Sequence, residues 1–169
     1  DAYIAAGHEV VALDNLVSGR REVVNPAARF IEADIRDAAL ADVFARERPG
    51  VVNHLAAQMN VTRSLKEPVY DAENNVLGTV NVLQCCADHG VRKLIFASTS
   101  GAIYGEPDRL PVTEDMPAAP LSHYGVSKLC GEQYIRLYQA IYGLAFTILR
   151  YSNVYGPRQL PHGEAGICA

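Results

Sequence analysis

The sequence predicts an α/β fold built on a doubly wound parallel sheet. Short apolar runs, typical of parallel strands that are covered on both faces, alternate along the chain with longer segments of helical periodicity. Polar residues directly follow several of these runs, at the strand ends where open α/β sheets bind their ligands. The 169 residues are enough to bury one core, so we expect one principal domain.

Composition and charge argue against several classes of protein. A net charge of −4 without a basic stripe argues against nucleic acid as a partner. No apolar run approaches the roughly 18 residues that span a bilayer, so we expect no membrane partner and a cytoplasmic protein. The four cysteines form no Cys-x-x-Cys pair and the five histidines lack metal-ligand spacing, so we expect no metal site.

The first residues have the pattern of the second half of a βαβ unit. Residues 1–6 resemble the end of a helix with Gly7 as its C-cap, and residues 8–13 form a strand that ends at Asp14. We therefore expect a fragment that lacks a preceding strand and glycine-rich turn. An acid at this strand end can accept hydrogen bonds from a ribose diol and repel a 2′-phosphate, which favours NAD. The alternative is a simple turn capped by Asp14.

Three further elements follow in the first third of the chain. Residues 28–32 predict a second strand, and Asp37 is placed to cap a helix over residues 38–48. Residues 51–55 predict a buried strand, followed by small residues that would let a ligand approach the backbone. We expect His54, within this strand, to be a core histidine rather than a catalyst.

The middle of the chain predicts a helix over residues 68–89 and a strand over residues 94–97. Hydroxyl-bearing residues, including Thr99 and Ser100, follow this strand. They lie where an α/β sheet binds ligands, although hydroxyls in such a turn can also bond their own backbone.

The last helix is predicted over residues 122–143 and carries Tyr124 and Lys128 one turn apart on one face. An ammonium near a phenol favours the phenolate, which is a general base at neutral pH. The spacing alone is a weak signal, because a tyrosine packed on a lysine stem gives the same pattern. A strand over residues 144–150 follows, and the remainder reads as loop.

Taken in order, these motifs resemble the extended short-chain dehydrogenase/reductases, and within them the NAD-dependent epimerase/dehydratase group. The resemblance covers essentially the whole chain and rests on residues 13–16, 32–35, 54–58, 74–79, 96–99, 104–105, 124–128 and 149–158. It implies a Rossmann-like NAD-binding domain over residues 1–152, incomplete at its N-terminus. Residues 153–169 would only begin a C-terminal substrate-binding region.

The resemblance also implies a role for particular residues. The catalytic set would be Thr99, Tyr124 and Lys128. The adenine ribose of NAD would be held by Asp14, Asn15, Leu16, Val17, Ser18 and Gly19, and its adenine by Asp34 and Ile35. Its pyrophosphate and nicotinamide side would be lined by Leu55, Ala56, Ala57, Gln58, Met59 and Asn74. Its nicotinamide end would contact Ser152 together with the catalytic set. The substrate would contact Thr99, Ser100, Tyr124 and Asn153.

Two positions depart from the family pattern. Met59 falls where well-known members carry a lysine. The loop after the strand over residues 94–97 is one residue longer than in some members, so the catalytic hydroxyl is Thr99 when counted from the strand and Ser100 when counted back from residues 104–105. We choose Thr99, because sheet register fixes the strand side.

The activity implied by the resemblance is epimerisation of a nucleotide sugar at C4, interconverting UDP-glucose and UDP-galactose through a 4-keto intermediate with tightly bound NAD. A homodimer is implied for the full-length protein. The alternatives are a 4,6-dehydratase or decarboxylase, which adds an acid after the catalytic hydroxyl where this chain has Ser100-Gly101-Ala102. A further alternative is a non-catalytic dinucleotide sensor, but such proteins tend to lose the tyrosine or lysine.

Overall fold

The computed structural model describes residues 1–157 and 159 of the chain. Its described residues form two parallel sheets, and no backbone pairing joins them. The first sheet pairs β1 (Val11–Asp14) with β2 (Arg29–Glu32). The second has the order β3 (Val51–His54), β4 (Lys93–Thr99) and β5 (Ala145–Tyr151). The predicted α/β class with parallel strands is confirmed.

The strand order is that of a doubly wound sheet interrupted at one place. In the usual order 3-2-1-4-5-6, the first strand lies between the second and the fourth. Here β2 and β1 correspond to strands 3 and 2, and β3, β4 and β5 to strands 4, 5 and 6. Within the described part of the chain, no strand pairs with both β1 and β3.

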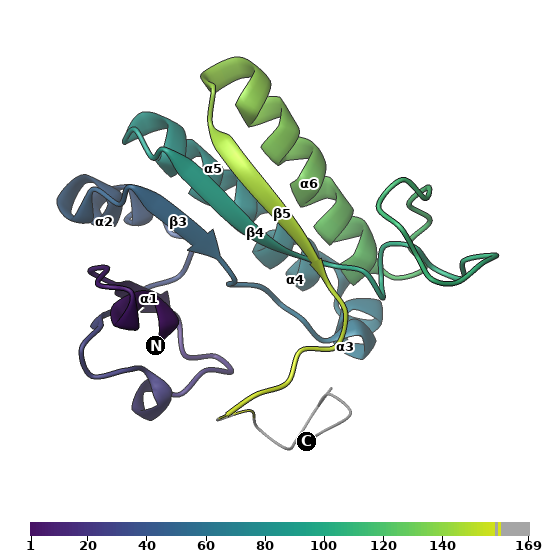
Figure 1. Cartoon of the computed structure of the whole chain (residues 1–169), viewed down its shortest axis with the longest axis horizontal. Helices are drawn as coiled ribbons and strands as arrows, with labels where there is room; N and C mark the ends of the chain where they lie inside the picture. The colour runs from purple at the N-terminus through teal and green to yellow at the C-terminus, as the bar shows by residue number, and fades with distance from the viewer. Residues whose placement is uncertain (158, 160–169) are drawn as a thin grey trace.

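Helices connect the strands and pack against the second sheet. Figure 1 shows α4, α5 and α6 gathered on one side of β3, β4 and β5, while the segment between β4 and α6 projects away from the sheet. The helices are α1 (Ala2–Ala5), α2 (Leu40–Glu47), α3 (Val61–Lys66), α4 (Pro68–Ala72), α5 (Gly78–Asp88) and α6 (His123–Tyr142), with a 3₁₀ turn η1 (Arg21–Val23) and a π-helical turn η2 (Glu73–Leu77).

One core joins the two sheets. Side chains next to β2 and from α2 cluster with α5, β4 and α6, and the members of this cluster include Ile35, Leu40, Phe44, Leu83, Leu94, Phe96 and Ile135. The Asn81 amide of α5 donates hydrogen bonds to the carbonyls of Ile35 (2.7 Å) and Asp37 (3.1 Å). These contacts tie the β1–β2 sheet to the helices of the second sheet.

The helix α6 follows its local sequence signals closely. The Ser122 hydroxyl caps the N-terminus by accepting from the Gly125 N–H (3.1 Å), and Gly143 ends the helix with a φ of 72°. Gly131 lets α6 pack directly on the sheet, because a Cβ there would lie 2.9 Å from the Phe96 ring. The predicted helix over residues 122–143 is confirmed.

Several predicted boundaries differ from the structure. The helix α2 begins at Leu40 rather than at residue 38, and Asp37 does not cap it: the Leu40 N–H bonds the Asp37 carbonyl in a turn, and the N-cap residue is Ala39. The helix α3 was not predicted, because six residues are too short for a periodicity signal.

The predicted helix over residues 68–89 is helical from Pro68 to Asp88, but η2 interrupts its α-helical geometry. π-helical turns are rare and occur frequently at functional sites. Gly78, where α5 begins, lies so close to Ile35 that a Cβ would be 2.6 Å from the Ile35 Cδ1. Within the described ranges, no helix is both long and apolar enough to cross a membrane, and no cluster of three metal-ligating side chains occurs.

Candidate active site at the carboxyl edge of the sheet

The structure places Tyr124 and Lys128 together at the start of α6. The Lys128 ammonium lies 5.9 Å from the centre of the Tyr124 ring and 4.9 Å from that of Phe96. It also donates a hydrogen bond to the Ala97 carbonyl of β4 (3.0 Å). The lysine is therefore held between the strand and the tyrosine, and the predicted sharing of one helix face is confirmed.

Burial controls the charge of this region. Lys128 is 4% exposed, and burial lowers its pKa to about 8 even though the negative charge of Asp71 opposes that shift. Burial and the Lys128 charge lower the pKa of His54 to about 3, and its Nε2 lies 3.0 Å from the Thr79 hydroxyl. At neutral pH the lysine is mostly charged and the histidine is neutral, as expected of a core histidine.

The hydroxyl residues at the end of β4 lie beside this pair. Thr99 is the last residue of the strand, is half-buried, and accepts a hydrogen bond from the Ala102 N–H at 3.3 Å. A Cβ at Gly125 would overlap the Ala102 carbonyl oxygen, so the loop after Thr99 rests directly on the first turn of α6. This contact holds the loop that follows Thr99 against the residue next to Tyr124.

The turn after β1 is folded around Asp14. The Asp14 carboxylate accepts from the Leu16 N–H (2.7 Å), and Leu16 has a φ of 58°, unusual for a residue other than glycine. A Cβ at Gly19 would lie 2.8 Å from the Asp14 Oδ1, so a larger residue there would displace the Asp14 carboxylate. Asp14 itself is exposed and acceptor-rich, which fits the ribose diol that the sequence predicts for it.

The residues expected to contact adenine are only partly available. The Arg36 side chain and N–H hold Asp34 with three hydrogen bonds of 2.8–2.9 Å, which keep the pKa of that carboxyl well below its usual range. Asn15 also donates to Asp34 (2.9 Å). Ile35 is 8% exposed and its side chain belongs to the core, so any contact with adenine would use its backbone.

Of the residues in the loop after β3 that are expected to contact NAD, some are exposed and one has a buried side chain. Leu55 and Met59 are exposed, and Ala56 and Ala57 are half-buried. Gln58 is 8% exposed and its side chain bonds inside the protein, so it shapes the loop rather than facing solvent.

Three further expected contact residues have different surroundings. Asn74 is buried and its amide donates to the Tyr70 carbonyl (2.7 Å). Ser152 and Asn153 follow β5 and are exposed. Residues 158 and 160–169, which belong to the expected substrate region, lie outside the described residues. The roles assigned to these side chains stay predictions.

A buried charge network beside the site was not predicted. The Glu132 carboxylate accepts two hydrogen bonds from Arg150 (2.9 and 2.6 Å) and one from Ser98 (2.6 Å), and Arg150 also donates to the Tyr104 hydroxyl (2.6 Å). Burial alone would raise the pKa of Glu132, but the bonds from Arg150 and Ser98 lower it overall. The sequence feature that could have indicated this network is Glu132 itself, a carboxylate one turn after Lys128 on the buried face of α6.

A parallel α/β sheet whose carboxyl edge carries a Tyr-x-x-x-Lys pair beside a hydroxyl residue defines the class of the short-chain dehydrogenase/reductases. The chain belongs to the NAD dependent epimerase/dehydratase family, whose sequence profile matches residues 1–168.

Relatives agree with this assignment in sequence and in structure. The chain is 50% identical to a putative UDP-glucose 4-epimerase of Methanocaldococcus jannaschii over 99% of its own length and 55% of the relative. It superposes on the Thermus thermophilus UDP-glucose 4-epimerase in complex with NAD (TM-score 0.94, 48% identity, 98% of this chain and 54% of the other). It also superposes on the Thermotoga maritima UDP-glucose 4-epimerase with UDP-glucose (TM-score 0.95, 44% identity, 99% and 55%). The chain thus spans about half the length of the relatives it matches.

Proposed function

We propose that the chain is the NAD-binding and catalytic part of a nucleotide-sugar 4-epimerase that interconverts UDP-glucose and UDP-galactose. The observation that carries this proposal is the Tyr124–Lys128 pair, with its 5.9 Å separation between ammonium and ring, beside the hydroxyl end of β4. The names of the relatives support the same activity and substrates. We expect a cytoplasmic protein, where thiols stay reduced, because Cys85, Cys86 and Cys130 are free.

The chain's residues have distinct tasks in this reaction. Tyr124, as the phenolate, accepts the proton of the sugar 4-hydroxyl, and the ammonium of Lys128 stabilises that phenolate. Thr99 hydrogen-bonds the same sugar oxygen. NAD, when bound, would supply the acceptor for the hydride that leaves C4 and would give it back to the other face of the 4-keto sugar.

Two polar side chains of the chain fit such a cofactor, one as an acceptor and one as a donor of hydrogen bonds. The exposed Asp14 carboxylate can accept from the hydroxyls of the adenine ribose, and Lys128 can donate to the nicotinamide ribose. We propose that residues 1–152 form this NAD-binding domain and that residues 153–169 begin the substrate-binding region. Ser152 and Asn153, which are exposed after β5, would meet the nicotinamide and the nucleotide sugar.

The residues after Thr99 favour epimerisation over dehydration. Elimination of the 6-hydroxyl needs an additional acid close to the catalytic hydroxyl. Ser100, Gly101 and Ala102 follow Thr99 and carry no carboxylate.

Product analysis separates these activities. The full-length protein containing this sequence is incubated with UDP-galactose, and the products are resolved by chromatography and NMR. The proposal predicts UDP-glucose at the equilibrium ratio with no net consumption of NAD. A 4-keto-6-deoxy sugar would instead identify a dehydratase, and the absence of turnover with tight NAD binding would indicate a sensor.

Replacing Thr99 should distinguish it from Ser100. We expect Thr99→Ala to lower kcat about 10- to 100-fold, because a hydrogen bond to a developing charge contributes roughly 1.5–3 kcal/mol. Ser100→Ala should change kcat less than about threefold, and steady-state kinetics with UDP-galactose measure both. The opposite ranking would move the catalytic role to Ser100.

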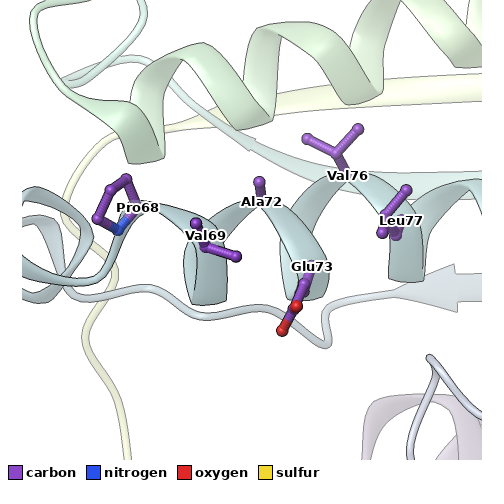
Figure 2. Close-up of a pocket in the computed structure, with 6 residues that line it drawn as sticks. All are labelled: Pro68, Val69, Ala72, Glu73, Val76 and Leu77. Atoms are coloured by element: carbon purple, nitrogen blue, oxygen red, sulfur yellow. The ribbon is translucent and has the colours of Figure 1, made fainter.

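An apolar surface on α4 and η2 supports the proposed homodimer. Val69 is 70% exposed and Leu77 62% exposed. They border a hollow of about 510 Å³ whose lining residues are Pro68, Val69, Ala72, Glu73, Val76 and Leu77, drawn one after another in Figure 2. The neighbouring α6 exposes further large apolar side chains, among them Leu137 and Ile141. Exposed apolar side chains around such a hollow favour burial against a second copy.

Placing a charge on this surface should weaken the dimer. We expect Leu77→Glu to shift the full-length protein from dimer to monomer in sedimentation velocity at micromolar concentration, because the carboxylate would lose its hydration in the interface. The matched control is Leu110→Glu, at an 80% exposed leucine in the loop before α6, which should remain dimeric. A Leu77→Glu variant that is still dimeric would place the interface elsewhere.

A further inference from the structure

Asp71 is a buried carboxylate that the proposed mechanism does not use. Its side chain, on α4, is 0% exposed. One oxygen, Oδ1, accepts from the amides of Gln58 (2.8 Å) and Asn75 (3.0 Å), and Oδ2 accepts from the Ser127 hydroxyl (2.6 Å). Burying a carboxylate costs the free energy of its hydration, and an apolar residue could fill the same space without that cost. A buried carboxylate at this position therefore indicates a specific role.

The partners of Asp71 come from three separate elements. Gln58 belongs to the loop after β3, Asn75 to the π-helical turn η2, and Ser127 to α6, immediately before Lys128. The Asn75 amide also pairs with both backbone groups of Gln58, accepting from its N–H and donating to its carbonyl (2.8 Å each). The Asp71 carboxylate therefore binds both the loop after β3 and the turn of α6 that carries Lys128.

Resting on the epimerase function proposed above, we propose that Asp71 is a positioning residue for the Tyr124–Lys128 pair. Its hydrogen bonds fix the β3 loop and α6 relative to each other, and its negative charge is the buried counter-charge of the Lys128 ammonium. It acts on the reaction through Lys128 and touches neither cofactor nor sugar.

The other charged or titratable groups around Lys128 cannot replace Asp71. His54 of β3 is neutral, and Tyr124 is the group that Lys128 serves. Glu132, one turn further along α6, is bonded to Arg150 of β5, so its charge is already matched. Burial lowers the pKa of Lys128 and the charge of Asp71 raises it, which agrees with the geometry.

The variant Asp71→Asn removes the charge and can keep the hydrogen bonds. The asparagine oxygen can accept from Gln58 and Asn75, as Oδ1 does now. Its amide takes the place of Oδ2 and can donate to Ser127, whose hydroxyl is free to rotate and accept. Asp71→Ser, smaller and also uncharged, serves as a second variant if the first does not fold.

The direct test is the titration of Lys128 itself. Lysine labelled with ¹³C at Cε is followed by NMR against pH, without cofactor or sugar, and the Lys128 signal is assigned with Lys128→Met. We expect the pKa of Lys128 to be lower in Asp71→Asn than in the unmodified protein, because the negative charge of Asp71 raises it. The matched control is Glu67→Gln, an exposed carboxylate one turn earlier, which should leave this pKa unchanged.

The same change should appear in the kinetics of the full-length protein. Because the ammonium is needed, the alkaline limb of the kcat profile should move to lower pH by the same amount, with KM for UDP-galactose changed less than about twofold. A folded Asp71→Asn or Asp71→Ser variant with an unshifted Lys128 pKa overturns the proposal. Since the titration uses no substrate, that result is separate from a failure of the epimerase function, which the product analysis detects.

Discussion

Tyr124→Phe is expected to lower kcat by about 10²–10⁴-fold, the usual contribution of a positioned general base. The substitution removes only the phenol oxygen, and the aromatic ring that lies 5.9 Å from the Lys128 ammonium remains. Binding of the nucleotide sugar should therefore change less than about twofold. Steady-state turnover of UDP-galactose and calorimetric binding of the same compound measure the two effects separately.

A control for this prediction lies on the same helix. Tyr134 is 38% exposed, and Tyr134→Phe deletes a phenol oxygen from α6 without touching the Tyr124–Lys128 pair. It should keep kcat within about twofold. If Tyr124→Phe retains comparable turnover, Tyr124 is not the proton acceptor.

Arg150→Met is expected to cost about 3–5 kcal/mol in the free energy of unfolding, the range for breaking one side of a buried ion pair. Glu132 is 1% exposed and would keep a charge without its counter-ion. The Tyr104 hydroxyl would lose its bond from Arg150 as well. Urea unfolding followed by circular dichroism measures the change, and the thermal midpoint should fall by roughly 6–20 °C.

The double variant Glu132→Gln with Arg150→Met tests the cause of that loss. It removes both charges while leaving an acceptor for the Ser98 hydroxyl. We expect it to be more stable than Arg150→Met alone, because no uncompensated charge stays buried. A double variant that is no more stable than Arg150→Met would mean that the lost packing of the Arg150 stem, rather than an uncompensated charge on Glu132, causes the destabilisation.

The parts of the site that the sequence predicts are those fixed by local geometry. Tyr124 and Lys128 are one helical turn apart, and the Ser122 cap and Gly143 that bound α6 are adjacent in sequence to the turns they control. The turn after β1 is equally local, since Asp14 bonds a backbone group two residues away.

The parts that could not be predicted depend on contacts between distant segments. Asp71 meets Ser127 across 56 residues, and Ser98 meets Glu132 across 34. Nothing in the neighbourhood of these residues indicates their partners, because only the packing of α6 on β4 and α4 brings them together. The inward orientation of the Gln58 side chain could not be predicted for the same reason, because it depends on a hydrogen bond to Asp71.

The choice between Thr99 and Ser100 as the catalytic hydroxyl depends partly on the sheet and partly on the bound sugar. The strand β4 extends two residues beyond the predicted strand and ends at Thr99, which pairs with Tyr151 of β5. The sheet therefore fixes Thr99, whereas Ser100 begins the loop. The chemical role of either hydroxyl depends on the bound sugar, so the kinetic comparison of the two alanine variants decides it.

In the proposed reaction, this carboxyl edge oxidises a sugar at C4 and returns the same hydrogen to it. The measurement is the fate of the label when UDP-galactose carrying deuterium at C4 is converted by the full-length protein in ordinary water. The proposed mechanism predicts UDP-glucose with the deuterium retained at C4, detected by mass spectrometry and by the missing proton signal at that position. Deuterium lost to solvent, or retained in a product still of the galactose configuration, would contradict it.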